Sequence, residues 1–315
     1  MKKLALLVLV VVVLGIGSVY YFIPDTLVVT ALANANCVPD AAFRNMSDQA
    51  GWARWWPVAA SAGTGNAGDT VFRVGKYKYS LSKKLANNFE ILIASDKDTL
   101  RSEINLLSLP HDSTLIKWHF SIPAGSNIIG RITAYSKASS LKKELTTILN
   151  NLQAYLSNFS NLYGFTLKQA SIKDTFLIST KSFSANYPTT ELVYQLADKL
   201  KNFGSSNGAM VTGVPMLNIT TVSPSGYSVM VAIHVNHVIQ GKDSVTMIKM
   251  VPGQFIVTDV TGGPQTLALI HQQIRHYFQD YGRVTMAVPF EYLLTDRQKE
   301  KDTSKWTTRI YSPVY

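Results

Sequence analysis

The chain is poor in cysteine, with Cys37 as the single thiol among 315 residues. One thiol excludes an intrachain disulfide and any metal site built from paired thiolates. We interpret Cys37 as a buried structural residue. The sequence also lacks the HExxH motif of zinc peptidases and a pair of catalytic carboxylates. No two histidines have a spacing suited to joint metal binding, so we predict neither a metal nor a cofactor.

Charge is also scarce, because only 16% of the residues are charged, although the net charge is +10. The densest basic stretch runs from Arg73 to Lys84, where basic residues alternate with Val74, Tyr77 and Tyr79. This alternation is typical of a strand with one face in water. No helix-turn-helix, zinc-finger or RNA-binding signature accompanies it, so we predict no nucleic-acid partner.

The N-terminal segment from Leu4 to Ile23 carries no charge. Twenty residues in a helix span roughly 30 Å, which is the thickness of a bilayer core. Lys2 and Lys3 favour a cytoplasmic N-terminus. We therefore predict a single-pass membrane anchor in residues 1–25, with residues 4–23 in the membrane and the soluble domains outside the cytoplasm. A cleaved signal peptide is the alternative.

The rest of the chain is long enough for two domains, and its patterning predicts an α+β fold. The first domain is expected at residues 26–165. Short alternating segments predict an antiparallel sheet, at residues 26–33, 70–79, 88–94, 102–109 and 113–122. A helix from about Ser140 to Tyr163 has an apolar stripe that suits it to cover this sheet.

The segments Val38–Phe43 and Trp52–Pro57 resemble the START-like (SRPBCC, polyketide cyclase-like) family. This resemblance implies a helix-grip fold, in which a curved sheet wraps the long helix. It also implies an apolar cavity for a hydrophobic ligand between the sheet and the helix. The alternative is that the tryptophans at 52, 55 and 56 only pack the core.

The second domain, expected at residues 170–315, contains an internal repeat. Helical segments at 189–203 and 264–281 are each followed by a strand with a Val-Pro pair, Val214-Pro215 and Val288-Pro289. The two pairs are 288 − 214 = 74 residues apart. Each half is expected to fold as strand, helix, strand, strand, with a cleft at the seam between the halves.

The repeat places Leu217 in the position that Glu291 occupies in the second half. A carboxylate is costly to bury unless it is paired, and the expected strand from Arg283 to Leu294 is otherwise largely apolar. Either Glu291 binds a cationic or hydrogen-bond-donating ligand, or its side chain points to solvent.

The second domain also resembles the GyrI-like (gyrase-inhibitor-like) effector-binding family. The matching motifs are Gly213-Val214-Pro215, Met250–Phe255, Glu291–Asp296 and Thr308–Val314. The resemblance implies that Glu291 faces a central cleft among aromatic rings, which suits lipophilic cations. We predict a ligand site formed by Glu291, Tyr292, Leu217, Phe183, Tyr187 and Trp306.

Together these patterns predict a membrane anchor, a helix-grip START-like domain and a duplicated GyrI-like domain. The favoured function is that of a membrane-anchored protein, not an enzyme, that binds an amphipathic or cationic ligand around Glu291. A hydrophobic ligand in the START-like cavity is a further expectation. The alternatives are a small hydrolase with Glu291 as general base, and a structural or interaction protein with degenerate clefts.

Overall fold

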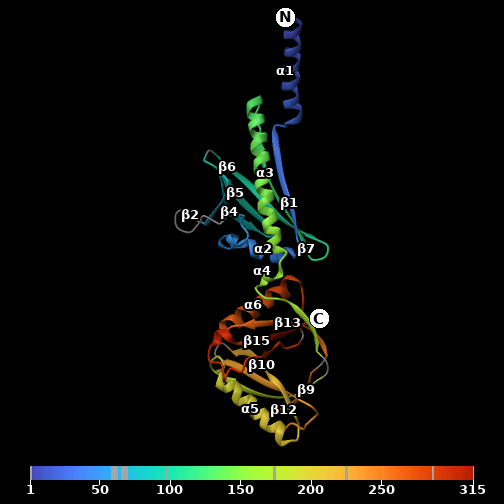
Figure 1. Cartoon of the computed structure of the whole chain (residues 1–315), viewed down its shortest axis with the longest axis vertical. Helices are drawn as coiled ribbons and strands as arrows, with labels where there is room; N and C mark the ends of the chain where they lie inside the picture. The colour runs from blue at the N-terminus through green and yellow to red at the C-terminus, as the bar shows by residue number, and fades with distance from the viewer. Residues whose placement is uncertain are drawn as a thin grey trace. The chain divides into compact units, whose positions relative to one another are not determined.

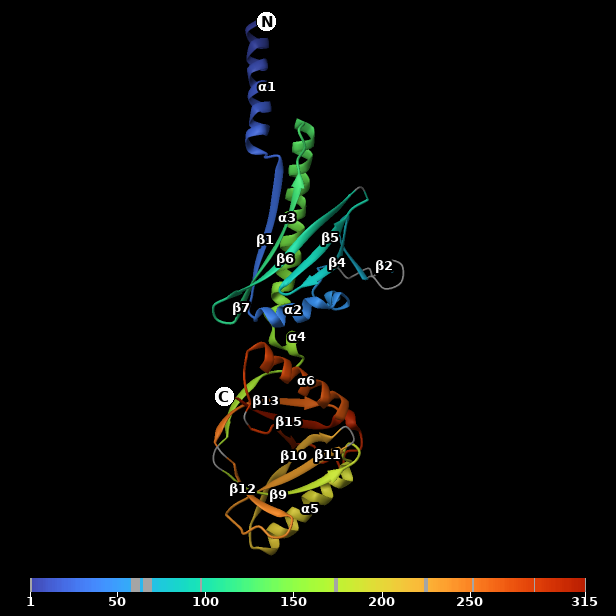
Figure 2. The same ribbon diagram turned by 180° about the vertical axis from the view of Figure 1, so that it is seen from behind.

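The computed structural model of the chain is an α+β protein, shown from two sides in Figures 1 and 2. It describes residues 2–57, 63–64, 70–96, 98–172, 175–223, 226–250, 252–285 and 287–314. Met1 of the predicted anchor and Val251 of the GyrI-like motif lie outside the described residues. The chain divides into two compact units, Met1–Leu162 and Tyr163–Tyr315.

The predicted membrane anchor corresponds to helix α1 (Lys2–Phe22). Within the described part of the chain, no helix combines the length and the apolar character needed to cross a bilayer. The predictions of a single-pass anchor at residues 4–23 and of extracytoplasmic domains are therefore contradicted. The last turn of α1 instead packs on the first unit, where the Tyr20 hydroxyl donates to the Ser126 carbonyl at 2.9 Å.

The first unit is built on a seven-stranded antiparallel sheet with the order β1-β7-β6-β5-β4-β3-β2 among the described strands. Its strands are β1 (Thr26–Ala35), β2 (Gly63–Thr64), β3 (Thr70–Val74), β4 (Tyr77–Leu85), β5 (Asn88–Ala94), β6 (Thr99–Leu109) and β7 (Ser113–Pro123). Burial alternates along β5 and β7 as the sequence predicts, because successive side chains point to opposite faces.

Helix α3 (Ile128–Leu156) covers one face of this sheet, and the short helix α4 (Phe159–Tyr163) follows it. The predicted helix began near Ser140. The real one begins twelve residues earlier, where the Asn127 side chain accepts a hydrogen bond from the Gly130 N–H and caps the first turn. The apolar stripe marked only the fully buried C-terminal part of α3, because the N-terminal part buries Arg131, Ala134 and Ala138 in place of large apolar side chains.

The predicted apolar cavity beside α3 is filled by side chains. A side chain with no exposed surface cannot border a space large enough for water. The stripe residues of α3 are all 0% exposed, namely Leu141, Leu145, Ile148, Leu149, Leu152 and Leu156. This packing removes the basis for a hydrophobic ligand at this place. The groove of this unit lies elsewhere, between the end of β7 and the start of α3.

The three tryptophans that follow helix α2 (Pro39–Ser47) pack the other end of the sheet. They lie in and after the 3₁₀ helix η1 (Gln49–Arg54) and are almost fully buried. Trp52 stacks on Trp56 with ring centroids 5.8 Å apart, and its indole N–H donates to the Met46 carbonyl at 2.8 Å. Their role is core packing, which was the alternative interpretation of these residues.

The second unit is an eight-stranded sheet with the order β12-β9-β11-β10-β14-β15-β13-β8 and two helices. The elements are β8 (Lys168–Ile172), β9 (Thr175–Ser184), α5 (Thr190–Ser206), β10 (Val211–Ser223), β11 (Gly226–Val235), β12 (Val245–Met250), β13 (Gly253–Thr261), α6 (Pro264–Asp280), β14 (Phe290–Leu293), η2 (Thr303–Lys305) and β15 (Thr307–Val314). Helix α5 lies against β9, β10 and β11, and α6 lies against β13 (Figure 1).

The internal repeat is visible in this order, because β9-α5-β10-β11 is followed by β13-α6-β14-β15. The two helices start at Thr190 and Pro264, which are 264 − 190 = 74 residues apart. Among the described residues of the strand predicted at 283–294, only Phe290–Leu293 form a strand, β14. Pro289 directly precedes it and has no N–H to donate to a neighbouring strand. In the first repeat, Pro215 instead lies in a bulge of the longer strand β10.

Candidate functional site

The two repeats meet in the sheet where β10 pairs with β14. Two residue pairs form this seam, Met216 with Tyr292 and Leu217 with Glu291. The residue that the repeat equates with Glu291 is therefore its direct neighbour across the seam. Because side chains alternate along a strand, Glu291 and Leu293 point to the face covered by the helices, and Phe290 points to the opposite face.

Glu291 is a largely buried carboxylate with one paired and one unpaired oxygen. Its side chain is 12% exposed, and Oε1 accepts a hydrogen bond from His271 Nε2 of α6 at 2.7 Å. Oε2 is buried and has no hydrogen-bond partner among the described residues. A buried acceptor without a donor costs free energy. The folded chain thus leaves Oε2 as an unsatisfied acceptor.

A cavity of about 200 Å³ lies beside this carboxylate, at the start of α5. Three of the predicted site residues line it, namely Tyr187, Leu217 and Trp306, together with Tyr194, Leu293 and Arg297. Glu291 does not itself line the cavity. Its negative charge nevertheless acts on Tyr187 and on Arg297. The carboxylate therefore lies within electrostatic reach of the cavity wall.

Arg297 brings a positive charge into the same wall. It is 8% exposed, its guanidinium lies 4.6 Å from the ring centroid of Trp306, and its Nη2 donates to Thr308 Oγ1 at 2.7 Å. Burial lowers the pKa of Arg297, and the charge of Glu291 opposes that shift. An arginine remains protonated under such conditions, so the site holds one fixed cation and one carboxylate.

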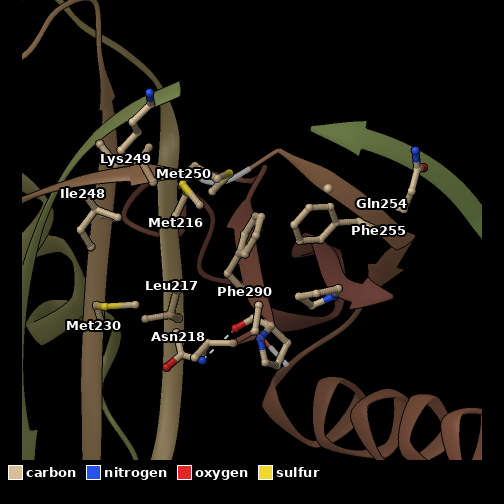
Figure 3. Close-up of a pocket in the computed structure, with 17 residues that line it drawn as sticks. Met216, Leu217, Asn218, Met230, Ile248, Lys249, Met250, Gln254, Phe255 and Phe290 are labelled. Atoms are coloured by element: carbon tan, nitrogen blue, oxygen red, sulfur yellow. Dashed lines mark hydrogen bonds between the residues drawn. The ribbon is translucent and has the colours of Figure 1, made fainter. Parts of the chain in front are cut away.

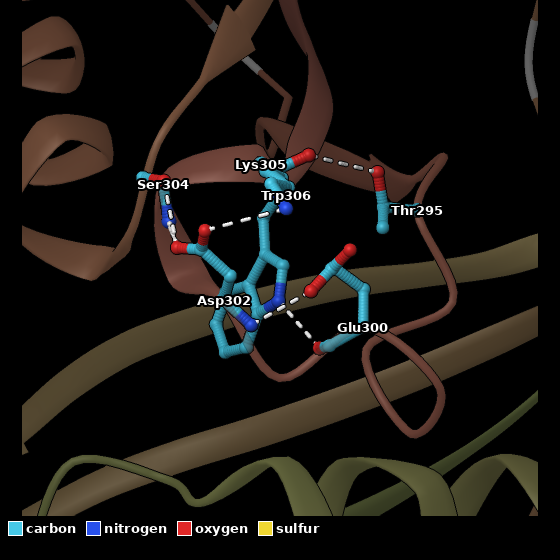
Figure 4. Close-up of polar contacts among 6 residues, drawn as sticks. All are labelled: Thr295, Glu300, Asp302, Ser304, Lys305 and Trp306. Carbon is cyan, nitrogen blue, oxygen red and sulfur yellow. Dashed lines mark hydrogen bonds and ion pairs between the residues drawn. The ribbon is translucent and has the colours of Figure 1, made fainter.

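Trp306 is held in place by the loop that precedes β15, as Figure 4 shows. Its indole N–H donates to the Glu300 carbonyl at 2.9 Å. The Glu300 side chain accepts from the Asp302 N–H at 2.8 Å, and Asp302 accepts from the Ser304 N–H and hydroxyl at 3.0 and 2.6 Å. These local bonds order the loop and fix the ring beside the cavity.

Tyr187 is the most exposed of the aromatic residues that line the cavity, with 47% of its surface in solvent. Its ring packs edge to face on Tyr227, with centroids 5.7 Å apart. Burial of the hydroxyl raises the pKa of Tyr187, and the charge of Glu291 raises it further. The hydroxyl therefore stays protonated at neutral pH and can donate a hydrogen bond.

Two of the predicted site residues lie away from this cavity. Phe183 is on β9, is 63% exposed and does not line the cavity. Tyr292 faces the opposite side of the sheet, where its hydroxyl lies 2.6 Å from His234 Nε2. Burial raises the pKa of Tyr292 to about 12. Because Glu291 and Tyr292 are adjacent on one strand, their side chains point to opposite faces of the sheet.

Sequence reasoning missed His271 and Arg297. The histidine spacing had indicated no metal site, and Arg297 carried no pattern of its own. A useful signal was available for His271, because it falls on the helix stripe otherwise formed by Leu267, Ile270 and Ile274. A polar residue next to such a stripe indicates contact with a polar group below the helix.

Comparison with known proteins gives only distant likenesses. No protein-family model and no curated protein matches the sequence. Among solved structures, the chain is similar to the EcmrR C-terminal domain, with 13% identity and a TM-score of 0.42 over 48% of this chain and 98% of that domain. It is also similar to SAV2435 bound to tetraphenylphosphonium, with 18% identity and a TM-score of 0.31 over 48% of this chain and 94% of that one.

A third similar structure is a hydrolase encoded by lin2189 from Listeria innocua. The identity is 13% and the TM-score 0.35, over 50% of this chain and 96% of that one. Likenesses at this level do not show which ligand this chain binds or whether it is an enzyme. The START-like resemblance of the first unit is not confirmed by these comparisons.

Proposed function

We propose that the second unit is a small-molecule-binding domain and that its ligand lies in the cavity beside Glu291. The ligand is amphipathic, and it directs a cationic or hydrogen-bond-donating group to Glu291 Oε2. The observation that carries this proposal is the buried Oε2 without a partner, on a carboxylate whose charge acts on two wall residues of a cavity of about 200 Å³. A ligand donor would satisfy this oxygen, which the folded chain leaves unpaired.

The composition of the cavity wall supports an amphipathic ligand. Leu217, Leu293 and the ring of Trp306 offer apolar surface, while the hydroxyl of Tyr187 can form hydrogen bonds. Arg297 also faces this space, so a cationic group of the ligand would meet repulsion near the guanidinium and must lie away from it. These features favour a ligand with a single donor group. The GyrI-like resemblance of residues 170–315 gives the same expectation of a cleft ligand at Glu291.

The test is a titration of single-charge amphipathic ammonium cations, which carry N–H donors, with phenethylammonium as the first probe, against the wild type and Glu291→Gln. Glutamine keeps the shape of the side chain and removes its charge. A hydrogen bond to a charged group contributes about 1.5–3 kcal/mol, so we expect the affinity to fall roughly ten- to hundredfold. The control is Glu103→Gln, whose side chain is 54% exposed in the first unit.

Two results would contradict the proposal. One is equal affinity of the wild type and Glu291→Gln for every cation, and the other is no binding by either protein. In that case the second unit would be a structural or interaction domain with a cleft that is not used. Thermal unfolding of both variants checks that the fold is kept, which we expect because the amide oxygen of the introduced glutamine can still accept the hydrogen bond from His271 Nε2.

A second candidate function is hydrolysis, and the Glu291–His271 pair favours it. A carboxylate that holds an imidazole at 2.7 Å can orient it as a general base toward a water molecule. An enzyme of this kind would convert bound esters or amides into products that mass spectrometry detects. Turnover that is lost in both Glu291→Gln and His271→Gln would establish hydrolysis, whereas ligands recovered intact would leave binding as the function.

A further inference from the structure

A second cavity, of about 240 Å³, lies on the face of the sheet away from α5 and α6. Figure 3 shows its lining, which comes from the strands β9 to β15 and the segment before β14. Methionine and aromatic side chains dominate this lining, namely Met216, Met230, Met250, Phe255 and Phe290. Phe290 is the direct neighbour of Glu291 on β14, so one strand separates the two cavities.

The polar side chains of this lining are already bonded or lie in water. Asn218 Nδ2 donates to the Pro289 carbonyl at 2.8 Å, and Asn218 Oδ1 accepts from the Thr220 hydroxyl at 3.0 Å. Lys249 and Gln254 are exposed. Among the described lining residues, no buried side-chain nitrogen or oxygen lacks a hydrogen-bond partner. A charged ligand group would lose its hydration here without compensation.

The apolar side chains suit a planar aromatic ligand. Phe255 and Phe290 meet edge to face with centroids 5.7 Å apart, and Phe290 stacks on Tyr311 at 4.9 Å. Methionine side chains adapt to irregular shapes and make favourable sulfur–aromatic contacts. An apolar cavity of ~150 Å³ can hold one benzene ring. This cavity is larger, so it has room for a two-ring molecule.

We propose that this Met/Phe cavity is a second ligand site, and that it takes an uncharged lipophilic molecule with an aromatic ring system. The site is distinct from the one at Glu291, because side-chain alternation on β14 sends Glu291 and Phe290 to opposite faces. The chemistry of the two ligands also differs. One cavity has the Arg297 guanidinium and the Tyr187 hydroxyl in its wall and lies within electrostatic reach of Glu291, and the other presents sulfur and carbon.

The probe for this site is N-phenyl-1-naphthylamine, an uncharged two-ring fluorophore that brightens in apolar surroundings. It is titrated into the full chain labelled with ¹³C at the methionine methyl groups. We expect the methyl signals of Met216, Met230 and Met250 to shift with one common affinity. Met46 is buried in the first unit and serves as the internal control whose signal should not move. Assignment uses one Met→Leu variant at a time.

A substitution that fills the cavity gives the matched variant. Ala232 is 5% exposed and lines the cavity, so Ala232→Met places a larger side chain in the ligand space. We expect the affinity for the probe to fall at least tenfold. Ala268→Met makes the same change on the exposed face of α6 and should leave the affinity unaltered. If Ala232→Met does not fold, the methyl shifts of the wild type decide the question.

The test of the Met/Phe cavity can succeed or fail independently of the test of the Glu291 site. Glu291→Gln should lower the affinity for phenethylammonium and leave the affinity for N-phenyl-1-naphthylamine unchanged. Methyl shifts at Met46 instead of the three lining methionines, or no shift at any of them, would overturn the Met/Phe cavity as a ligand site. An equal affinity of Ala232→Met and wild type would overturn it as well.

Discussion

The two units use the same kind of building block, an antiparallel sheet covered by helices, but they fill it differently. In the first unit, the stripe of α3 and the rings of Trp52, Tyr79 and Trp118 leave almost no exposed surface at the interface. In the second unit, cavities remain on both faces of the sheet, and one carboxylate oxygen is buried without a partner.

The difference in packing has opposite effects on stability and on ligand binding. Close packing of apolar side chains maximises the surface removed from water and the dispersion contacts. It leaves no room for a ligand. A sheet with unfilled space gives up part of this stabilisation and keeps surfaces that a ligand can cover. The comparison therefore predicts that side-chain truncations cost more in the first unit than beside the cavities of the second.

The largest effect is expected for Leu149→Ala in the first unit. Leu149 is 0% exposed, so truncation removes buried surface and leaves a void that close-packed neighbours cannot fill. We expect the free energy of unfolding of this unit to fall by about 2–5 kcal/mol. Urea unfolding followed by peptide-resolved hydrogen exchange measures it unit by unit, because a two-unit chain need not unfold in one step.

The comparison within this experiment is Ile219→Ala in the second unit. Ile219 is half-buried and borders the cavity beside Glu291, so its side chain has neighbours on fewer sides. The cost should be clearly smaller than that of Leu149→Ala. Equal costs at the two positions would break the distinction between a filled and an unfilled unit.

An intermediate effect is expected for Tyr79→Phe. The Tyr79 hydroxyl is buried against the sheet and donates to Glu144 Oε2 of α3 at 3.1 Å. Burial, followed by the charge of Glu144, holds the pKa of Tyr79 far above its usual range, so the hydroxyl remains a donor. Losing this bond should lower the stability of the first unit by about 1–2 kcal/mol, because Glu144 is partly open to water.

Tyr135→Phe on the exposed side of α3 is the control for this change. Tyr135 is 56% exposed, and the substitution should alter the stability by less than about 0.5 kcal/mol. If Tyr79→Phe were equally neutral, the polar contact between α3 and the sheet would contribute nothing, and apolar packing alone would hold this unit together.

The smallest expected effect concerns how the stability of the second unit depends on pH. Burial lowers the pKa of His234 from its usual 6.5. Above pH 6.5 the ring is neutral in both states. As the pH falls below 6.5 the unfolded chain takes up the proton first, so the stability of the second unit should decrease until the folded-state pKa is passed. Unfolding measured above and below pH 6.5 should show a smaller loss for His234→Gln than for wild type.

His237→Gln provides the reference, because His237 is exposed on the loop after β11. This variant should keep the pH dependence of the wild type. A pH dependence unchanged in His234→Gln would mean that other groups, and not this half-buried ring, set the acid sensitivity of the unit.

The sequence was most informative where its pattern is local or repeated. The 74-residue offset located both helices of the second unit, and it equated Leu217 with Glu291, which are paired across the seam. The start of α3 could not be predicted, because Ile129, Ile132 and Tyr135 are exposed there and give no regular stripe.

The site itself was only partly predictable. Tyr187, Leu217 and Trp306 do line one cavity, whereas His271 and Arg297 reach Glu291 from a helix and a loop that only the tertiary fold brings together. Tyr292 was predicted to share the ligand site with Glu291, but adjacent residues of a strand point to opposite faces, so Tyr292 lies on the other side of the sheet. The apolar run of residues 4–23 predicted an anchor that the described helices do not support.

The seam of the second unit has a mechanical consequence. Two residue pairs connect β10 to β14, so the backbone contributes little to joining the halves. Side chains supply the remaining attachment, where Asn218 holds the Pro289 carbonyl and the Tyr194 hydroxyl accepts from the Arg297 N–H at 2.8 Å. Each of these two hydrogen bonds joins residues that line one of the two cavities. A molecule in either cavity would therefore contact residues whose hydrogen bonds join the two halves of the unit.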